Sequence, residues 1–209
     1  VIPLRRLKAM DLSQYRVIVF PDGHGYAELL GKEGIERLQR WVHDGGVLVG
    51  IRGGAEFFRE KDVALSKVKP WAPPGSEKED DKDEVEVEET RYNDFRVPGA
   101  AFRTTMNENS YLTFGVGTAP AVLVEGDDVL LPTSHKVDNV LTIRSETPLV
   151  SGFAWPESID RLAGSAFVVN EPNGTGSVIT FAGEPHYRLY WKGTLPIFLN
   201  AVLYGPSLK

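Results

Sequence analysis

The chain has 209 residues and no cysteine. Disulfide bonds, thiolate metal sites and a cysteine nucleophile are therefore excluded, while the redox compartment stays open. No run of about 18 apolar residues occurs, so the sequence predicts no membrane-spanning helix. No signal peptide is visible either. Because the chain starts at Val1 rather than at a methionine, we expect a domain excised from a longer polypeptide.

An excess of positive charge is also lacking. The formal net charge is −6, and residues 76–90 hold nine acids and two lysines, which leaves the rest of the chain at +1. A near-neutral body lacks the basic surface that nucleic acid binding requires. We expect residues 70–90, which are rich in proline and then in acids, to be a flexible insertion in a single domain spanning 1–209. Val85 and Val87 alternate with acids, which also allows a charged edge strand there.

The stretch on which the functional argument depends is 47–54. Its uncharged residues 47–51 predict a strand buried on both faces, as in a parallel sheet. Glycines 50, 53 and 54 flank a sharp turn, and a helical pattern begins at 55. This strand–turn–helix arrangement is typical of a nucleophile elbow. Its central residue is Arg52, whose guanidinium stays protonated and is no nucleophile.

Other elements follow from periodicity. Residues 1–4 are compatible with a short strand, 16–20 predict a strand ending in a turn at 21–25, and 32–44 predict an amphipathic helix. The second half is expected to be rich in β-structure, with Asn173-Gly174 typical of a hairpin turn between strands at 165–170 and 177–181. Further short strands are expected at 100–105, 121–125, 140–144 and 149–154, and a C-terminal helix at 195–204.

Together these motifs resemble the class I glutamine amidotransferase-like fold. The resemblance rests on 17–23, on the helix end at 41–46 and on the elbow at 50–54. More closely, the chain is similar to the C-terminal accessory domain of some bacterial zinc carboxypeptidases of the carboxypeptidase A type. The segments that carry this closer resemblance are 97–103, 162–164, 176–179, 187–194 and 198–201.

The resemblance implies an α/β fold, a flavodoxin-like three-layer sandwich with a mixed, mainly parallel sheet and added β-rich segments. It also implies a non-catalytic accessory domain for docking or for recognition of substrate or ligand. The partner would be the peptidase domain of the same polypeptide, which alone would carry zinc, in a periplasmic or secreted protein. The first strand usual in this fold is not evident before Val1. The His and Glu that form the acid–base pair of an amidotransferase have possible counterparts in His186 and Glu184, which occur here in the reverse order.

Six residues are candidates for a cleft at the elbow, namely Arg52, Gly53, His24, Asp22, Glu184 and His186. Arg52 and the adjacent amides could hold an anion such as a carboxylate. Alternatively, Arg52 forms an internal salt bridge to Glu184, Asp22 or Glu56. A small-molecule sensor for carboxylates or peptides, and a hydrolase with an unrecognised nucleophile, therefore stay open as other functions.

No catalytic residue and no metal site are predicted for this fragment, and we expect no cofactor in it. His24 and Glu28 lie one residue too far apart for the ligand pair of such zinc peptidases, and no second histidine lies nearby. Ser134, His135 and Asp138 are close in sequence, but a catalytic triad assembles in space rather than in a short loop. Trp71 and Trp155, each near a proline, are candidates for docking a neighbouring domain.

Overall fold

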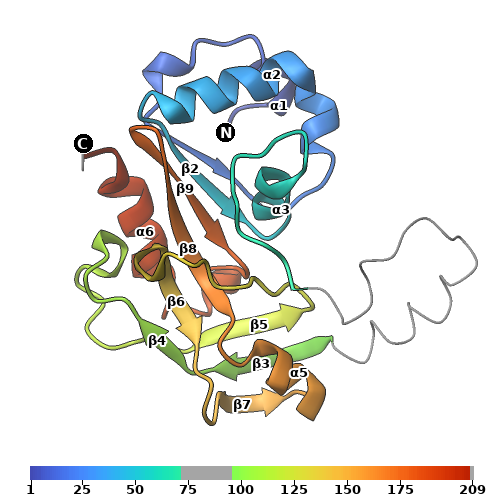
Figure 1. Cartoon of the computed structure of the whole chain (residues 1–209), viewed down its shortest axis with the longest axis vertical. Coiled ribbons are helices and arrows are strands. Elements are labelled where there is room, and N and C mark those ends of the chain that lie inside the picture. The colour runs from blue at the N-terminus through green and yellow to red at the C-terminus, as the bar shows by residue number, and fades with distance from the viewer. Residues whose placement is uncertain (72–95, 208–209) are drawn as a thin grey trace, which may run out of the picture.

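The computed structural model describes residues 1–71 and 96–207, and Figure 1 shows their arrangement. Of the predicted insertion at 70–90, residues 72–90 lie outside these ranges, as does the possible strand around Val85 and Val87, while Pro70 forms an isolated β-bridge with Leu130. The first half contains α1 (Leu4–Leu7), β1 (Val17–Phe20), α2 (Tyr26–His43), β2 (Val47–Ile51) and α3 (Gly53–Arg59). The second half contains β3 (Val97–Phe102), β4 (Thr104–Met106), β5 (Val122–Gly126), β6 (Asn139–Ile143), β7 (Leu149–Phe153), α5 (Pro156–Leu162), β8 (Ala166–Asn173), β9 (Gly176–Phe181) and α6 (Leu195–Leu203).

The main sheet has six strands in the order β1-β2-β9-β8-β6-β4. The strands β1, β2 and β9 are parallel neighbours, and β8, β6 and β4 then alternate in direction, so four of the six strands run the same way. A second, antiparallel sheet has the order β5-β3-β7. The mixed α/β architecture with added β-structure predicted from the sequence is therefore observed.

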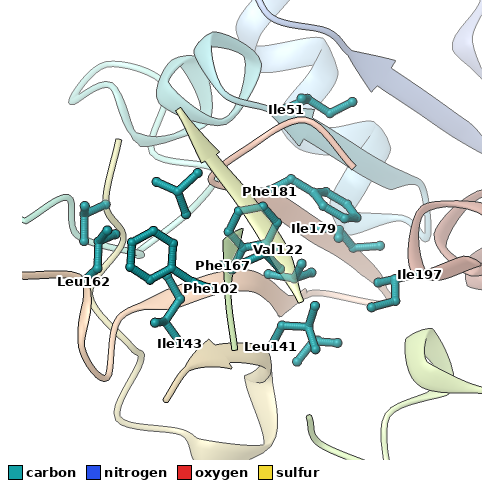
Figure 2. Packing of buried hydrophobic residues seen from close by; sticks show 14 of the residues in the cluster. Ile51, Phe102, Val122, Leu141, Ile143, Leu162, Phe167, Ile179, Phe181 and Ile197 are labelled. Atoms are coloured by element: carbon teal, nitrogen blue, oxygen red, sulfur yellow. The ribbon is translucent and has the colours of Figure 1, made fainter. Parts of the chain in front are cut away.

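Strand β2 is buried on both faces, as its uncharged sequence predicts. Val47, Val49 and Ile51 belong to the larger core, which also contains residues of α6 and of the second sheet. Leu48 belongs to a separate core beneath α2 and α3. Helices thus cover the parallel part of the sheet on both sides, which makes three layers. Figure 2 shows the larger core, where Ile51, Phe181 and Ile197 lie near residues of the second sheet such as Phe102 and Val122.

Two expectations about the ends of elements need correction. Residues 1–4 do not form a strand; instead α1 starts at Leu4, and its buried Leu7 packs in the core beneath α2. Helix α2 starts at Tyr26 rather than at 32, because it continues across a kink at Gly31, whose φ of 62° and ψ of 175° are not helical. Glycine adopts such a conformation at little cost, so the periodic pattern restarts after it.

Several predicted elements are confirmed. The hairpin formed by β8 and β9 turns at Gly174, where φ is 62°, and its strands extend closer to the turn than predicted. Three of the four shorter strand predictions correspond to β5, β6 and β7, whereas the single strand predicted at 100–105 is divided between β3 and β4, which belong to different sheets. Helix α6 occupies 195–203 as expected. The elements of the first half therefore place the end of β2 at the middle of the parallel strands, next to the end of β9.

Candidate functional site

Arg52 occupies the apex of a tight turn between β2 and α3. Its backbone has φ 48° and ψ −113°, a combination that is costly for a residue with a side chain. The Arg52 amide donates to the Phe181 carbonyl at 3.0 Å, and its carbonyl accepts from the Glu56 amide at 2.9 Å. The turn thus links the end of β9 to the first turn of α3. The predicted elbow, with Arg52 at its centre, is present.

Glycines make this turn possible because neighbouring backbone approaches it closely. A Cβ on Gly54 would lie 2.2 Å from the Phe20 carbonyl oxygen, and one on Gly53 would lie 2.2 Å from the Gly23 carbonyl oxygen. A Cβ on Gly50 would meet the Phe58 ring at 2.6 Å. The turn that follows β1 is therefore packed directly against the elbow, and this contact brings Asp22 to Arg52.

The Arg52 side chain is held by two carboxylates of the protein itself. Its Nε lies 3.3 Å from Asp128 Oδ2, to which it donates a hydrogen bond, and 3.6 Å from Asp22 Oδ2. The Arg52 side chain is only 25% exposed and that of Asp128 24%. The internal salt bridge considered from the sequence is therefore present with Asp22, while Asp128 is a partner that the sequence analysis did not name.

Asp22 also occupies the backbone amide beside the apex. The Gly53 N–H donates to Asp22 Oδ1 at 3.1 Å. In a catalytic elbow, the amide of the residue after the nucleophile helps to bind the oxyanion of the substrate. Here the Asp22 carboxylate occupies the position that the substrate oxyanion would take at this amide. The Nε of the guanidinium and the Gly53 amide, which could together bind an external anion, are therefore both already paired with carboxylates of the protein.

Asp128 lies in an unusual electrostatic setting. The pKa of Asp128 is raised from 3.8 to about 6, first by burial and then by the charge of the neighbouring Glu56 carboxyl and a hydrogen bond with it, while the Arg52 guanidinium opposes the increase. Burial also lowers the pKa of Arg59, whose Nη1 atom is buried with no hydrogen-bond partner among the described residues. The elbow is thus flanked by a cluster of opposite charges in which Asp128, Arg52 and Arg59 are half-buried or more, while Asp22 and Glu56 are exposed.

The other predicted cleft residues are only partly brought together. Glu184 lines a small hollow beside Arg52, together with Glu125 and Tyr187. His24 follows the turn at Asp22 but is exposed. His186 packs edge-on against the Phe198 ring of α6, with ring centroids 5.6 Å apart. The structure therefore groups Arg52, Gly53, Asp22 and Glu184, whereas the ring of His186 is engaged with α6.

The remaining candidates do not assemble a catalytic or metal site. Within residues 1–71 and 96–207, no side-chain hydrogen bond joins Ser134, His135 and Asp138, and no group of three potential ligands could hold a metal ion. In the same part of the chain, no helix is long and apolar enough to cross a bilayer.

Trp155 is 50% exposed and stacks edge-on with the 51% exposed Phe153. Trp71 is partly buried, with the Arg161 guanidinium 5.2 Å from its ring centroid.

Sequence comparisons find no relative, since neither a protein-family model nor a curated protein matches the chain. Solved structures do match. The cytoplasmic protein STM1381 of Salmonella typhimurium LT2 has a TM-score of 0.61 and 15% identity over 98% of this chain and 80% of its own. The cytoplasmic protein STM3548 of Salmonella typhimurium has a TM-score of 0.58 and 17% identity over 97% and 79%.

A ThuA-like protein of Bacteroides uniformis covers 99% of this chain with 14% identity, but its TM-score of 0.45 is too low to support an argument. At 15–17% identity, the two Salmonella proteins show the fold alone. Because they cover nearly the whole chain, the similarity extends to the second sheet and to α6 as well as to the elbow. The predicted α/β, flavodoxin-like fold class is confirmed.

Proposed function

We propose that this chain is a non-catalytic, amidotransferase-like accessory domain that serves docking or recognition within a larger protein. One observation supports this most strongly: Arg52 stands at the apex of the elbow, while Asp22 pairs with both its guanidinium and the Gly53 amide. A site of this kind has no nucleophile, and its anion-binding amide is already occupied. The scaffold of an amidotransferase thus persists in a form that stabilises the fold.

The parent that we propose is a zinc carboxypeptidase-like protein of the carboxypeptidase A type. The support is the sequence resemblance in 97–103, 187–194 and 198–201. Zinc and peptidase activity would then belong to another domain of the polypeptide, in a periplasmic or secreted protein. The exposed pair Phe153 and Trp155 supports a docking role, because large adjacent aromatic side chains are common at the centre of protein interfaces.

The second candidate function is a sensor for small carboxylates. The observation in its favour is the guanidinium itself, since arginine is well suited to bidentate binding of a carboxylate. A ligand would have to displace Asp22 or Asp128 from Arg52, which lowers its affinity. We therefore place this function second. A hydrolase is third, because no described side chain at the elbow is a nucleophile.

An assay of turnover and ligand binding separates these functions. The purified chain is separated by size-exclusion chromatography, and each fraction across its peak is incubated with glutamine or with peptide substrates, with and without a metal chelator. Release of glutamate or of C-terminal residues is then measured in each fraction. We expect no release above the uncatalysed rate. Turnover that co-elutes with the chain and resists chelation would contradict the proposal.

The sensor is tested in parallel by thermal unfolding with added carboxylates. A ligand at about ten times its Kd would stabilise the fold by about 1.4 kcal/mol and raise Tm by roughly 3 °C in a chain of this size. We expect no such increase. An increase in Tm that is lost in Arg52→Gln, but kept in the control variant Arg40→Gln on the exposed surface of α2, would favour the sensor instead.

A further inference from the structure

A groove of about 770 Å³ lies far from the elbow, at the opposite end of β9. Asn173 and Gly174 at the turn of the hairpin line it, whereas the elbow contacts Phe181 at the other end of the strand. The remaining walls are the segment 64–69 that follows α3 and the loop 131–138 that precedes β6. Its volume is within the range of roughly 300–1,000 Å³ that is typical of ligand sites. The groove shares no residue with the candidate cleft.

The first wall is fixed by a buried carboxylate. Glu171 is 8% exposed, and it accepts hydrogen bonds from the Ser66 hydroxyl and, at 2.8 Å, from the Lys67 amide. Val68 is buried against Leu130 and Val169. Lys67 and Lys69, on either side of Val68, are both exposed. Buried and exposed side chains alternate over residues 66–69, as they do in an extended segment, so the two lysines lie on the same side and about 6.5–7 Å apart along such a chain.

The second wall is fixed by an asparagine. Asn139 Oδ1 accepts from the Thr133 amide at 2.9 Å, and its Nδ2 donates to the Thr133 carbonyl at 3.0 Å. This clamp holds the loop that carries Ser134 and His135 into the groove. Both walls are therefore set by internal hydrogen bonds before any ligand arrives, which reduces the entropic cost of binding.

The charges of the lining are unequal. Lys67 and Lys69 are exposed and form no ion pair with another described residue. Two acids line the groove, Glu171 and Asp138. Both oxygens of Glu171 are engaged within the protein, which leaves Asp138, on the opposite wall, as the only lining carboxylate without such partners in the described chain. Glu171 keeps its negative charge but is buried, so the exposed charges of the wall formed by 64–69 are the two ammonium groups.

We propose that this groove binds an extended acidic peptide, with carboxylates two residues apart that meet Lys67 and Lys69. Alternate side chains of an extended peptide repeat at the same spacing of about 6.5–7 Å, so both contacts form without distortion of either chain. Pro172, at the rim, has no amide hydrogen to donate to an added strand. Recognition therefore proceeds through side chains rather than by extension of the sheet. This inference goes beyond the proposed function and uses no residue of the elbow.

The test uses a fluorescently labelled peptide with glutamate at alternate positions, titrated by fluorescence anisotropy at low and at physiological salt. Because Lys67 and Lys69 are exposed, Lys67→Gln with Lys69→Gln leaves the fold intact, which an unchanged Tm verifies. The control variant is Lys61→Gln, an exposed lysine outside the groove. We expect the double variant to weaken binding at least about fivefold and Lys61→Gln to change it less than about twofold.

Two further peptides separate a matched spacing from general charge attraction. A peptide of equal charge with its glutamates adjacent should bind more weakly, and one with glutamine in place of glutamate should not bind. The proposal is overturned if the glutamine peptide binds equally well, if the double variant binds like the unchanged protein, or if no binding is detected. It is also overturned if inorganic phosphate or a small dicarboxylate displaces the peptide at concentrations equal to those of the peptide itself, since the groove would then be a simple anion site.

Discussion

At the scale of single residues, Arg52 combines a strained backbone with a guanidinium whose Nε lies between two carboxylates of the protein. The sequence predicted the apex because glycines at 50, 53 and 54 left few other ways for the chain to turn. It also named Asp22 as a possible partner, since both residues follow parallel strands. It could not name Asp128, which is 76 residues away from Arg52 and approaches it only because of the way β5 is placed. Contacts of this kind are set by tertiary structure, and no local pattern signals them.

The raised pKa of Asp128 predicts a pH dependence of stability. The folded-state pKa of about 6 exceeds the ordinary value of 3.8, so the folded chain binds this proton more tightly than the unfolded chain does. Its contribution to stability is therefore complete below about 3.8 and is lost as pH rises through about 6. In Asp128→Asn this loss is removed. The free energy of unfolding of the variant, relative to the unchanged protein, should rise by on the order of 2 kcal/mol over that interval.

Urea unfolding at a series of pH values measures this difference. Asp62→Asn, which changes an exposed carboxylate after α3, is the matched control and should give a curve parallel to that of the unchanged protein. Parallel curves for Asp128→Asn itself would show that this carboxyl titrates normally, and the account of a half-buried Asp128 beside the charges of Glu56 and Arg52 would then be wrong.

At the scale of elements, local patterns performed best where one face or both faces of a segment are buried. The strands β1 and β2, the hairpin of β8 and β9, and helix α6 were all predicted near their observed bounds. Helix α5 was missed although Pro156 at its first turn and Glu157 beside it are typical of a helix start. It has only seven residues, too few for a periodic pattern to show. Helix α1 is shorter still, and its stability depends on packing against α2 rather than on its own sequence.

The elbow requires glycine at 54 because the end of β1 approaches the start of α3 closely at this position. Gly54→Ala should destabilise the protein by at least about 2 kcal/mol, since the new methyl group would lie 2.2 Å from the Phe20 carbonyl oxygen. Alanine favours a helix over glycine by only about 1 kcal/mol, so the clash outweighs the gain in propensity.

Thermal or urea unfolding tests this prediction. The control is Gly193→Ala, whose added methyl group would meet its nearest neighbour at an ordinary 3.4 Å and should change stability by less than about 1 kcal/mol. If Gly54→Ala were as stable as this control, the close approach of β1 to the elbow would be contradicted.

At the scale of the whole molecule, the sequence indicated the class of the fold but not its second half in detail. The strands from 97 to 153 were predicted as strands, yet their division between the end of the main sheet and a separate three-stranded sheet was not. Pairing partners depend on non-local contacts, and short strands of similar composition can be combined in several ways. The similarity to the two Salmonella structures covers the residues of both sheets.

Arg52 also acts at this largest scale, because it joins parts of the molecule that are distant in sequence. Asp22 follows β1 of the main sheet, while Asp128 follows β5 of the second sheet. The guanidinium between them links the two sheets at the apex of the elbow, where a nucleophile elbow carries its reactive residue. The central claim is therefore that Arg52 is neutralised by the protein and stabilises it.

A double-mutant cycle between Arg52→Gln and Asp22→Asn tests this claim most directly. Asparagine keeps an acceptor for the Gly53 amide and removes only the charge, so the cycle isolates the ion pair. The partly exposed pair should give a favourable coupling of about 0.5–1 kcal/mol in the free energy of unfolding, reduced by salt. A coupling of zero, with both single variants as stable as the unchanged protein, would show that Arg52 is not held by Asp22 and would contradict the account.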